Sequence, residues 1–186
     1  MGVKSKNILI LFIISFAIGL LDAIALPFFV RFFAENVLVV RAIGGLERSL
    51  ISLLAFYFLP KAFELEFSEL FISFTRKEKY RKYRYILAAL FLSIIFDILP
   101  FFLSLIDGFF LGTLAILLTA LGVLVIIMVM MLLIKKIFVA SVRSSIYIIL
   151  LTIIAEFLPT LILLISIWIK YGEYFPYHRF FKLFGI

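Results

Sequence analysis

Long apolar runs separated by short charged or turn-forming segments dominate the pattern of hydrophobic and polar positions along the chain. The runs at residues 86–106, 109–134 and 146–169 each reach the ~20 apolar residues needed to span a bilayer. A further run near the amino terminus follows a basic segment and lacks a small-residue cleavage site, which favours a retained signal-anchor helix over residues 8–33. Backbone polar groups in lipid must be satisfied within each segment, so these runs predict helices.

Residues 34–75 have the least regular pattern. Charged residues and a Gly-Gly pair interrupt residues 34–48, which suits a loop or a helix at the membrane surface. A second span over residues 49–74 is predicted if its charged turns face protein or water, and a broken or re-entrant helix is the alternative. Asp107-Gly108 is predicted to form the turn between the third and fourth spans. The chain is thus predicted to be a single membrane domain of about five spans, at residues 8–33, 49–74, 85–106, 109–134 and 145–169.

Composition agrees with an all-α, polytopic transmembrane helical bundle. Hydrophobic residues make up 66% of the 186 residues, whereas soluble domains are roughly half apolar, and the mean hydropathy is +1.29. The chain has no cysteine and one histidine, which excludes thiolate metal sites, cysteine nucleophiles and a histidine-rich metal centre made by this chain alone. No catalytic or cofactor motif is found, so no cofactor is expected and a protein that is not an enzyme is favoured.

The positions of the basic residues predict the orientation in the membrane. Most of the net charge of +7 lies between the apolar runs, above all in residues 76–84 (RKEKYRKYR). The positive-inside rule then predicts a cytoplasmic N-terminus, an outside C-terminus and a location in the plasma or inner membrane. The aromatic and basic tail, residues 170–186, is expected to lie at the membrane interface.

The lipid bilayer is the first expected partner, and nucleic acid is not expected, because topology and lipid account for the charge. Basic clusters beside a span are typical of anionic-lipid contacts at the cytoplasmic face. The residues expected to make them here are Arg76, Lys77, Lys79, Arg81, Lys82 and Arg84.

An acid-x-x-Pro element occurs in two of the apolar runs. Residues 94–100 read IIFDILP and residues 153–159 read IIAEFLP, an offset of 59 residues (153 − 94). In the predicted topology both copies cross the membrane in the same direction, so spans three and five form a weak parallel repeat. The doubled motif, with a Gly-containing turn between the spans, resembles small polytopic membrane proteins of candidate-phylum bacteria with small genomes. That resemblance implies a membrane helical fold over residues 85–169 and no known activity.

Three acids lie near the middle of predicted spans: Asp22, Asp97 and Glu156. A charged side chain at the bilayer centre costs ~2.5–3.5 kcal/mol on insertion scales, so each acid is expected to face protein, a cation or water. Pro100 and Pro159 each free a backbone carbonyl four residues earlier, beside a carboxyl group. Carboxylates next to free carbonyls are typical of Na⁺ and H⁺ sites at helix breaks. These five residues are therefore candidates for an ion or proton site.

A structural role is the alternative for the same acids. They would then be neutral and hydrogen-bonded to a neighbouring helix, or paired with Lys61 or Arg31. Small residues at three- to four-residue spacing also predict a helix-packing face in the fourth span. Its members are Gly108, Gly112, Thr119 and Gly122. Packing within the chain is favoured there over self-association.

Two functions are compatible with these features. The sequence favours a non-enzymatic subunit or scaffold of a membrane assembly, with other membrane subunits as partners. The alternative is a proton or cation carrier or channel that uses the mid-span carboxyl groups on proline-kinked helices.

Overall fold

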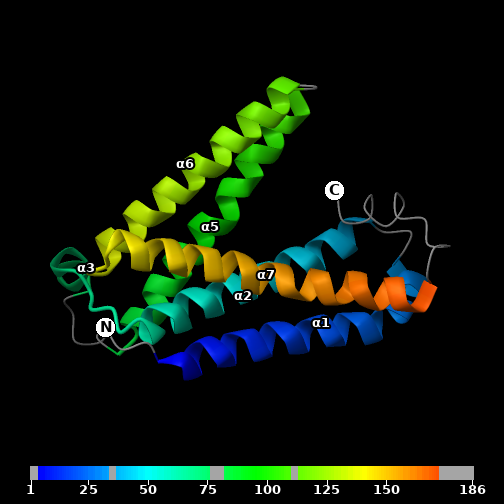
Figure 1. The fold of residues 1–186 in the computed structure, drawn as a ribbon, viewed down its shortest axis with the longest axis horizontal. Coiled ribbons are helices and arrows are strands. Elements are labelled where there is room, and N and C mark those ends of the chain that lie inside the picture. The colour runs from blue at the N-terminus through cyan, green and yellow to red at the C-terminus, as the bar shows by residue number, and fades with distance from the viewer. Residues whose placement is uncertain (1–3, 34–36, 76–81, 110–112, 172–186) are drawn as a thin grey trace.

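The computed structural model describes residues 4–33, 37–75, 82–109 and 113–171 (Figure 1). In this part of the chain the helices are α1 (Ser5–Phe33), α2 (Val37–Ala62), α3 (Glu69–Phe74), α5 (Arg84–Phe109), α6 (Thr113–Ile137) and α7 (Val142–Tyr171). The all-α helical bundle predicted from the sequence is confirmed. The tail beyond residue 171 lies outside the described residues, as do residues 76–81 of the basic loop.

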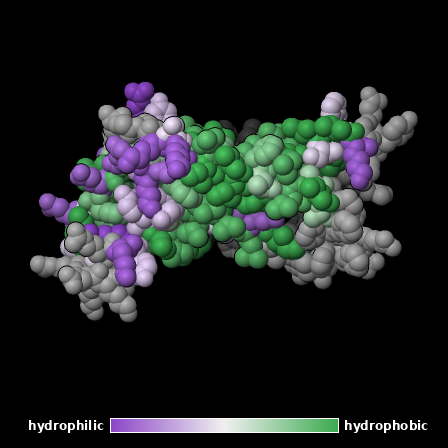
Figure 2. Space-filling view, turned by 90° about the horizontal axis from the view of Figure 1, so that it is seen from below, coloured by the Kyte–Doolittle hydropathy of each residue, from purple (hydrophilic) through white to green (hydrophobic). Residues whose placement is uncertain are grey.

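The long helices have the dimensions of membrane spans. They contain 25 to 30 residues each, or about 38–45 Å at 1.5 Å per residue, against a hydrocarbon core of ~30 Å. Among the described residues, α1, α2, α6 and α7 contain segments long and apolar enough to cross a membrane, and α5 forms a hairpin with α6. On the face shown in Figure 2, hydrophilic residues gather toward the ends of the molecule and apolar residues predominate in its middle. The protein is a multi-pass membrane protein.

Helices α1, α2 and α7 lie side by side in one layer, and the α5–α6 hairpin leans away from it (Figure 1). Helices α1, α5 and α7 all start at one end of the bundle, and α2 and α6 finish there, so α5 and α7 run in the same direction. This end, with α3 and the links on either side of it, is called the polar end below. The buried core lies between the layer and the near half of the hairpin, where the Phe56 and Phe96 rings meet edge to face with centroids 5.5 Å apart.

Helices α1 and α7 are in very close contact at Gly19. A Cβ added to Gly19 would lie 2.8 Å from the Pro159 Cα and 2.9 Å from the Ile162 Cδ1. Glycine at such a crossing lets two helix backbones approach each other in a membrane. The helix-packing face predicted from the sequence is in the fourth span, where Gly122 is half-buried in α6. Gly112, and the surroundings of Gly108 and Thr119, lie outside the described part.

The second span differs from its predicted position. Helix α2 already includes residues 37–48 and ends at Ala62, whereas a span over 49–74 was predicted. Its C-terminus is a Schellman motif. The Leu65 N–H donates to the Pro60 carbonyl at 2.9 Å, and the Glu64 N–H donates to the Lys61 carbonyl at 3.3 Å. Glu64 itself takes the left-handed conformation that stops the helix, with φ 50°.

The turn after α5 also falls later than predicted. Residues Asp107 and Gly108 belong to the last turn of α5, which continues to Phe109. Because orphan carbonyls already occur in the final turn of a helix, a polar residue and a glycine are tolerated there.

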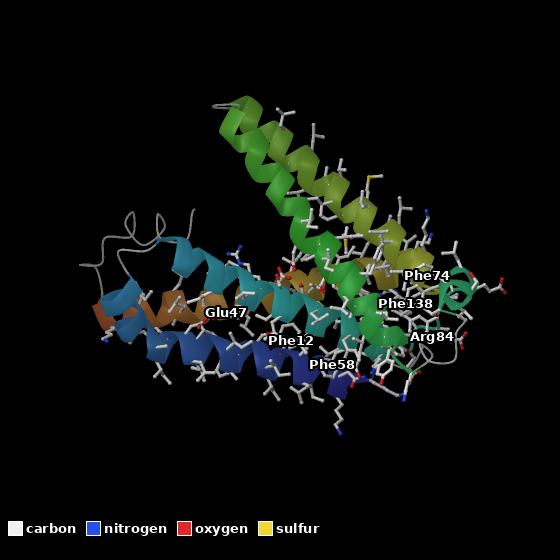
Figure 3. The ribbon with its side chains drawn as sticks, turned by 180° about the vertical axis from the view of Figure 1, so that it is seen from behind. Phe12, Glu47, Phe58, Phe74, Arg84 and Phe138 are labelled. Carbon is white, nitrogen blue, oxygen red and sulfur yellow. The ribbon has the colours of Figure 1, made fainter. Side chains whose placement is uncertain are left out.

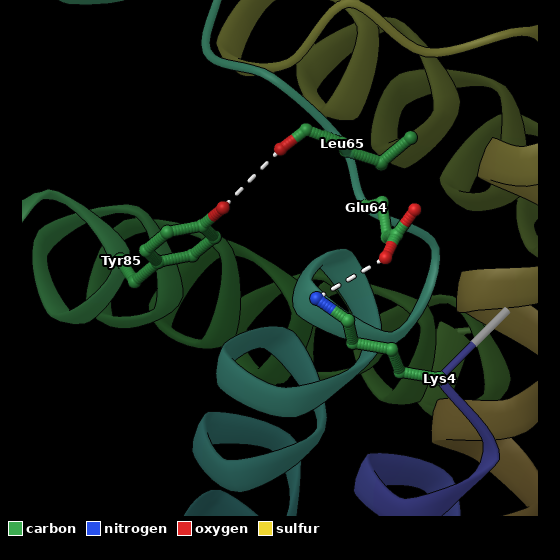
Figure 4. A network of polar contacts seen from close by, with 4 residues as sticks. All are labelled: Lys4, Glu64, Leu65 and Tyr85. Carbon is green, nitrogen blue, oxygen red and sulfur yellow. Dashed lines mark hydrogen bonds and ion pairs between the residues drawn. The ribbon is translucent and has the colours of Figure 1, made fainter. Parts of the chain in front are cut away.

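At the polar end, backbone and side-chain contacts tie three helices together (Figure 4). The Lys4 N–H donates to the Ala62 carbonyl at 2.7 Å, which satisfies an orphan acceptor of the last turn of α2. The Lys4 Nζ lies 3.1 Å from the Glu64 Oε1, and the Tyr85 hydroxyl donates to the Leu65 carbonyl at 3.3 Å. The starts of α1 and α5 are thereby fixed to the end of α2.

The link before α3 pairs with the link after α6. The Ser68 N–H donates to the Ile137 carbonyl at 2.9 Å, and the Val139 N–H donates to the Glu66 carbonyl at 2.8 Å. The Ser68 hydroxyl accepts from the N–H of Phe71 at 3.2 Å and so caps the start of α3. This pairing holds the short helix α3 against α6.

Candidate functional site

The three acids predicted as candidates lie at a common depth on three helices. Asp22 is in α1, Asp97 in α5 and Glu156 in α7. Each is about 20–26 Å along its helix from the polar end, given 1.5 Å per residue. They are thus near the middle of helices that are themselves the length of a bilayer.

Helix α2 supplies polar residues that interact with each of the three acids. It packs against α1, α5 and α7, and residues 47–52 of α2 read ERSLIS. Together with the three acids, four of these residues form what is called the acidic cluster below. Its members are Asp22, Glu47, Arg48, Ser49, Ser52, Asp97 and Glu156.

Asp22 pairs with a second carboxyl group. The Asp22 and Glu47 side chains are hydrogen-bonded to each other, and Glu47 lies in the layer of α1, α2 and α7 (Figure 3). A carboxylate can only accept a hydrogen bond, so a bond between two carboxyl groups requires a proton on one of them.

Asp97 is bound by hydroxyl groups of α2. The Ser52 hydroxyl lies 3.3 Å from the Asp97 Oδ2, and the Ser49 side chain makes a second hydrogen bond to the same carboxyl group. Ser52 is fully buried, and its hydroxyl also lies 3.1 Å from the Ser49 carbonyl. Asp97 thus has the hydrogen-bonded environment that the structural alternative required.

Glu156 is in a different environment, although its sequence motif matches that of Asp97. Its Oε1 atom is buried and has no hydrogen-bond partner among the described residues. The carboxyl group interacts electrostatically with the Asp97 carboxyl group and with the Arg48 guanidinium group. Buried polar atoms without a partner are rare in folded proteins and call for an explanation.

The structure also shows where some of the other residues predicted to take part in the site lie. Pro159 forms the close contact with Gly19 of α1, one helical turn from Asp22, and the surroundings of Pro100 lie outside the described part. Lys61 does not pair with an acid of the cluster, since its Nζ lies 3.5 Å from the Tyr57 ring centroid and 4.8 Å from that of Tyr85. The side chain of Arg31 is not among those described.

At the polar end two residues of the predicted lipid-binding loop can be seen. The Arg84 Nε donates to the Thr75 hydroxyl at 3.0 Å, and the Lys82 Nζ lies 5.4 Å from the Tyr83 ring centroid. The other four, Arg76, Lys77, Lys79 and Arg81, lie outside the described residues.

Sequence reasoning missed the four α2 members of the cluster. Glu47 and Arg48 made residues 34–48 look like a loop, because charged side chains in a span are unfavourable unless another helix partners them. Ser49 and Ser52 are spaced three residues apart and so share a helix face. That spacing does not indicate which residue of another helix they contact. The usable signal was a charged pair inside a segment, residues 37–59, that is mostly apolar apart from Arg41 and two serines.

Within the described residues, no group of three or more histidine, cysteine or acidic side chains has a geometry that could hold a metal ion. The fold and the cluster define a multi-pass α-helical membrane protein with buried acids at mid-span. No protein-family description matches the chain, and no curated protein or solved structure matches it either.

Proposed function

We propose that this membrane protein carries protons or alkali cations across the bilayer, with the acidic cluster as the binding site. The observation that supports this most is the buried Oε1 of Glu156, which has no hydrogen-bond partner among the described residues. Leaving such an atom unpaired costs roughly 1–3 kcal/mol. A proton or a cation bound between Glu156 and Asp97 would remove this cost, whereas a purely structural acid has no reason to bear it.

The balance of charged groups supports a positively charged ligand. The cluster contains four carboxyl groups and one guanidinium group. Acids inside a membrane that face a protein interior commonly mark ion pathways and proton relays.

Transport would require the cluster to open to each side in turn. The side chains of Phe56, Leu92 and Phe96 are buried in the core that separates the cluster from the polar end. Carriers commonly solve this by rocking one bundle against another around a fixed site. In this protein, the α5–α6 hairpin is the element proposed to move against the layer of α1, α2 and α7.

The polar end is proposed to face the cytoplasm of a plasma or inner membrane, with the N-terminus inside and the C-terminus outside. Support comes from the basic residues at this end, in agreement with the positive-inside rule. They include Lys4, Lys61, Lys82, Arg84, Lys135 and Lys136. The resemblance of the doubled motif to small membrane proteins of small-genome bacteria stays a prediction.

Flux measurements on the purified chain in liposomes test the proposal. A pH or Na⁺ gradient should drive a flux in the wild type that the double variant Asp97→Asn, Glu156→Gln abolishes. Glu66→Gln is the matched control, because Glu66 is exposed at the polar end, and its flux should equal that of the wild type. An undiminished flux in the double variant would contradict the proposal.

A subunit or scaffold of a membrane assembly is the second candidate, and the shape of the fold favours it. The α5–α6 hairpin stands apart from the layer over its far half (Figure 1), which offers surface to another subunit as well as to lipid. Native mass spectrometry in mild detergent should then show a complex or an oligomer. A lone monomer at all detergent concentrations would argue against this role.

A further inference from the structure

An apolar groove opens at the polar end between α3, α5 and α6. Its volume is about 550 Å³, and its lining includes Leu70, Phe74, Phe91, Leu133 and Lys136. This volume lies within the ~300–1,000 Å³ typical of small-molecule sites. All of the lining is hydrophobic except for the single lysine, so the groove combines a hydrocarbon-like interior with one cation.

The lining residues are ordered along the direction of the spans. Phe91 lies seven residues into α5, or about 10 Å from its first residue at the polar end. Lys136 lies in the last turn of α6, at the polar end itself. The groove therefore runs from an apolar interior at the level of hydrocarbon to a cationic rim at the level of lipid headgroups.

Helix α3 forms one wall of the groove and has the exposure of a helix that lies in the membrane interface. Phe71 is buried against the bundle, whereas the side chains of Leu70 and Phe74 are 66% and 84% exposed. Phe74, Phe138 and Arg84 lie together at the polar end (Figure 3). Large apolar side chains on a short surface helix are favourable when they dip into the headgroup region of a bilayer.

We infer that this groove binds one anionic phospholipid. An acyl chain lies between Leu70, Phe91 and Leu133, and the phosphate group meets the ammonium group of Lys136. Lys135 adds positive charge beside the rim, so the two lysines together outweigh the single exposed acid Glu69 of α3. Basic residues at the cytoplasmic surface attract anionic lipids by ~1 kcal/mol each, so charge complementarity favours an anionic over a zwitterionic headgroup. This site is independent of the proposed ion transport.

Native mass spectrometry of the full chain tests the inference. The protein is delipidated in mild detergent and offered phosphatidylglycerol and phosphatidylcholine in equal amounts. The wild type should retain phosphatidylglycerol preferentially, and Lys136→Gln should lower the ratio of the two bound lipids by about fivefold, the equivalent of ~1 kcal/mol. Lys135→Gln is the matched control, because Lys135 does not line the groove, and it should lower the ratio by less than twofold.

A second variant tests the acyl-chain part of the inference. Leu133→Trp fills the groove and should reduce the occupancy of both lipids at least threefold, and its unfolding temperature shows whether it remains folded. The inference is overturned if the wild type binds both lipids equally or if Lys135→Gln and Lys136→Gln lower the ratio equally. It is also overturned if a folded Leu133→Trp variant retains lipid like the wild type.

Discussion

The polar end and the acidic cluster use the same kinds of side chain in opposite ways. At the polar end, the Lys4 ammonium group meets the Glu64 carboxylate, and the Tyr85 hydroxyl donates to a backbone carbonyl. In the cluster, the carboxyl groups of Asp22 and Glu47 are hydrogen-bonded to each other, and the Oε1 of Glu156 is left without a partner among the described residues. The side chains of Lys4, Glu64 and Tyr85 at the polar end are thus paired, whereas one carboxyl oxygen of the cluster is not.

The cost of the two arrangements differs as well. The side chains of Lys4 and Glu64 are 66% and 44% exposed, and such surface ion pairs contribute ~0–1 kcal/mol. A buried polar atom that lacks a hydrogen bond costs about 1–3 kcal/mol. The polar end is thus accounted for by stability, whereas the acidic cluster contains an unpaired buried atom that stability does not account for.

The largest effect is expected where α1 and α7 meet beside the acidic cluster. Gly19→Ala places a Cβ 2.8 Å from the Pro159 Cα, which is backbone and cannot rotate away. The two helices must then move apart, and overpacking of this kind costs about 1–3 kcal/mol. The free energy of unfolding in mixed micelles should fall by that amount, with the polar end unaffected.

Gly45→Ala is the matched control for this prediction. Gly45 lies in α2, and an added Cβ there has nothing within 4 Å. Removal of a glycine from a helix interior should stabilise the protein by about 0.5–1 kcal/mol. If both variants change the unfolding free energy in the same direction, the close contact at Gly19 is not a constraint on the packing of α1 and α7.

The sequence was a good guide to the helices and to the three acids, and a poor guide to what surrounds them. Long apolar runs predict spans because a helix needs about 20 apolar residues to cross the hydrocarbon core, whatever its tertiary packing. The start of α2 was missed because hydropathy counts Glu47 and Arg48 as unfavourable without knowing that Asp22 and Glu156 interact with them. Partners 25 or more residues away in the chain leave no local pattern.

For the two copies of the acid-x-x-Pro motif, too, the sequence predicted the position of the acid but not its surroundings. Both copies lie at similar depth on helices that run in the same direction, as predicted. Their surroundings differ because α7 packs against both α1 and α2, whereas α5 packs against α2 and α6. Hydroxyl groups of α2 therefore reach Asp97 but not the buried oxygen of Glu156.

An intermediate effect is expected from replacing these two acids with leucine. Glu156→Leu removes a buried atom that has no partner and should stabilise the protein by about 1 kcal/mol. Asp97→Leu removes the acceptor of the Ser49 and Ser52 hydroxyl groups and should destabilise it by about 0.5–1.5 kcal/mol. Unfolding free energies at neutral pH measure both. Two changes of the same sign would show that the acids have equivalent surroundings.

The smallest effect is expected at the polar end, where Glu64 has a favourable side chain on an unfavourable backbone. Its φ of 50° is a left-handed conformation that costs a residue with a Cβ about 1–2 kcal/mol, whereas its ion pair with Lys4 returns at most ~1 kcal/mol. Glu64→Gly relieves the backbone strain and loses the ion pair, so the unfolding free energy should rise by about 0.5 kcal/mol.

Lys4→Gln and Glu64→Gln lose only the ion pair. Each should lower the unfolding free energy slightly, and by less in 1 M salt, where charges are screened. Because both Glu64→Gly and Glu64→Gln lose the ion pair, their difference isolates the backbone. If Glu64→Gly is less stable than Glu64→Gln, the left-handed conformation of residue 64 is not a cost that glycine relieves.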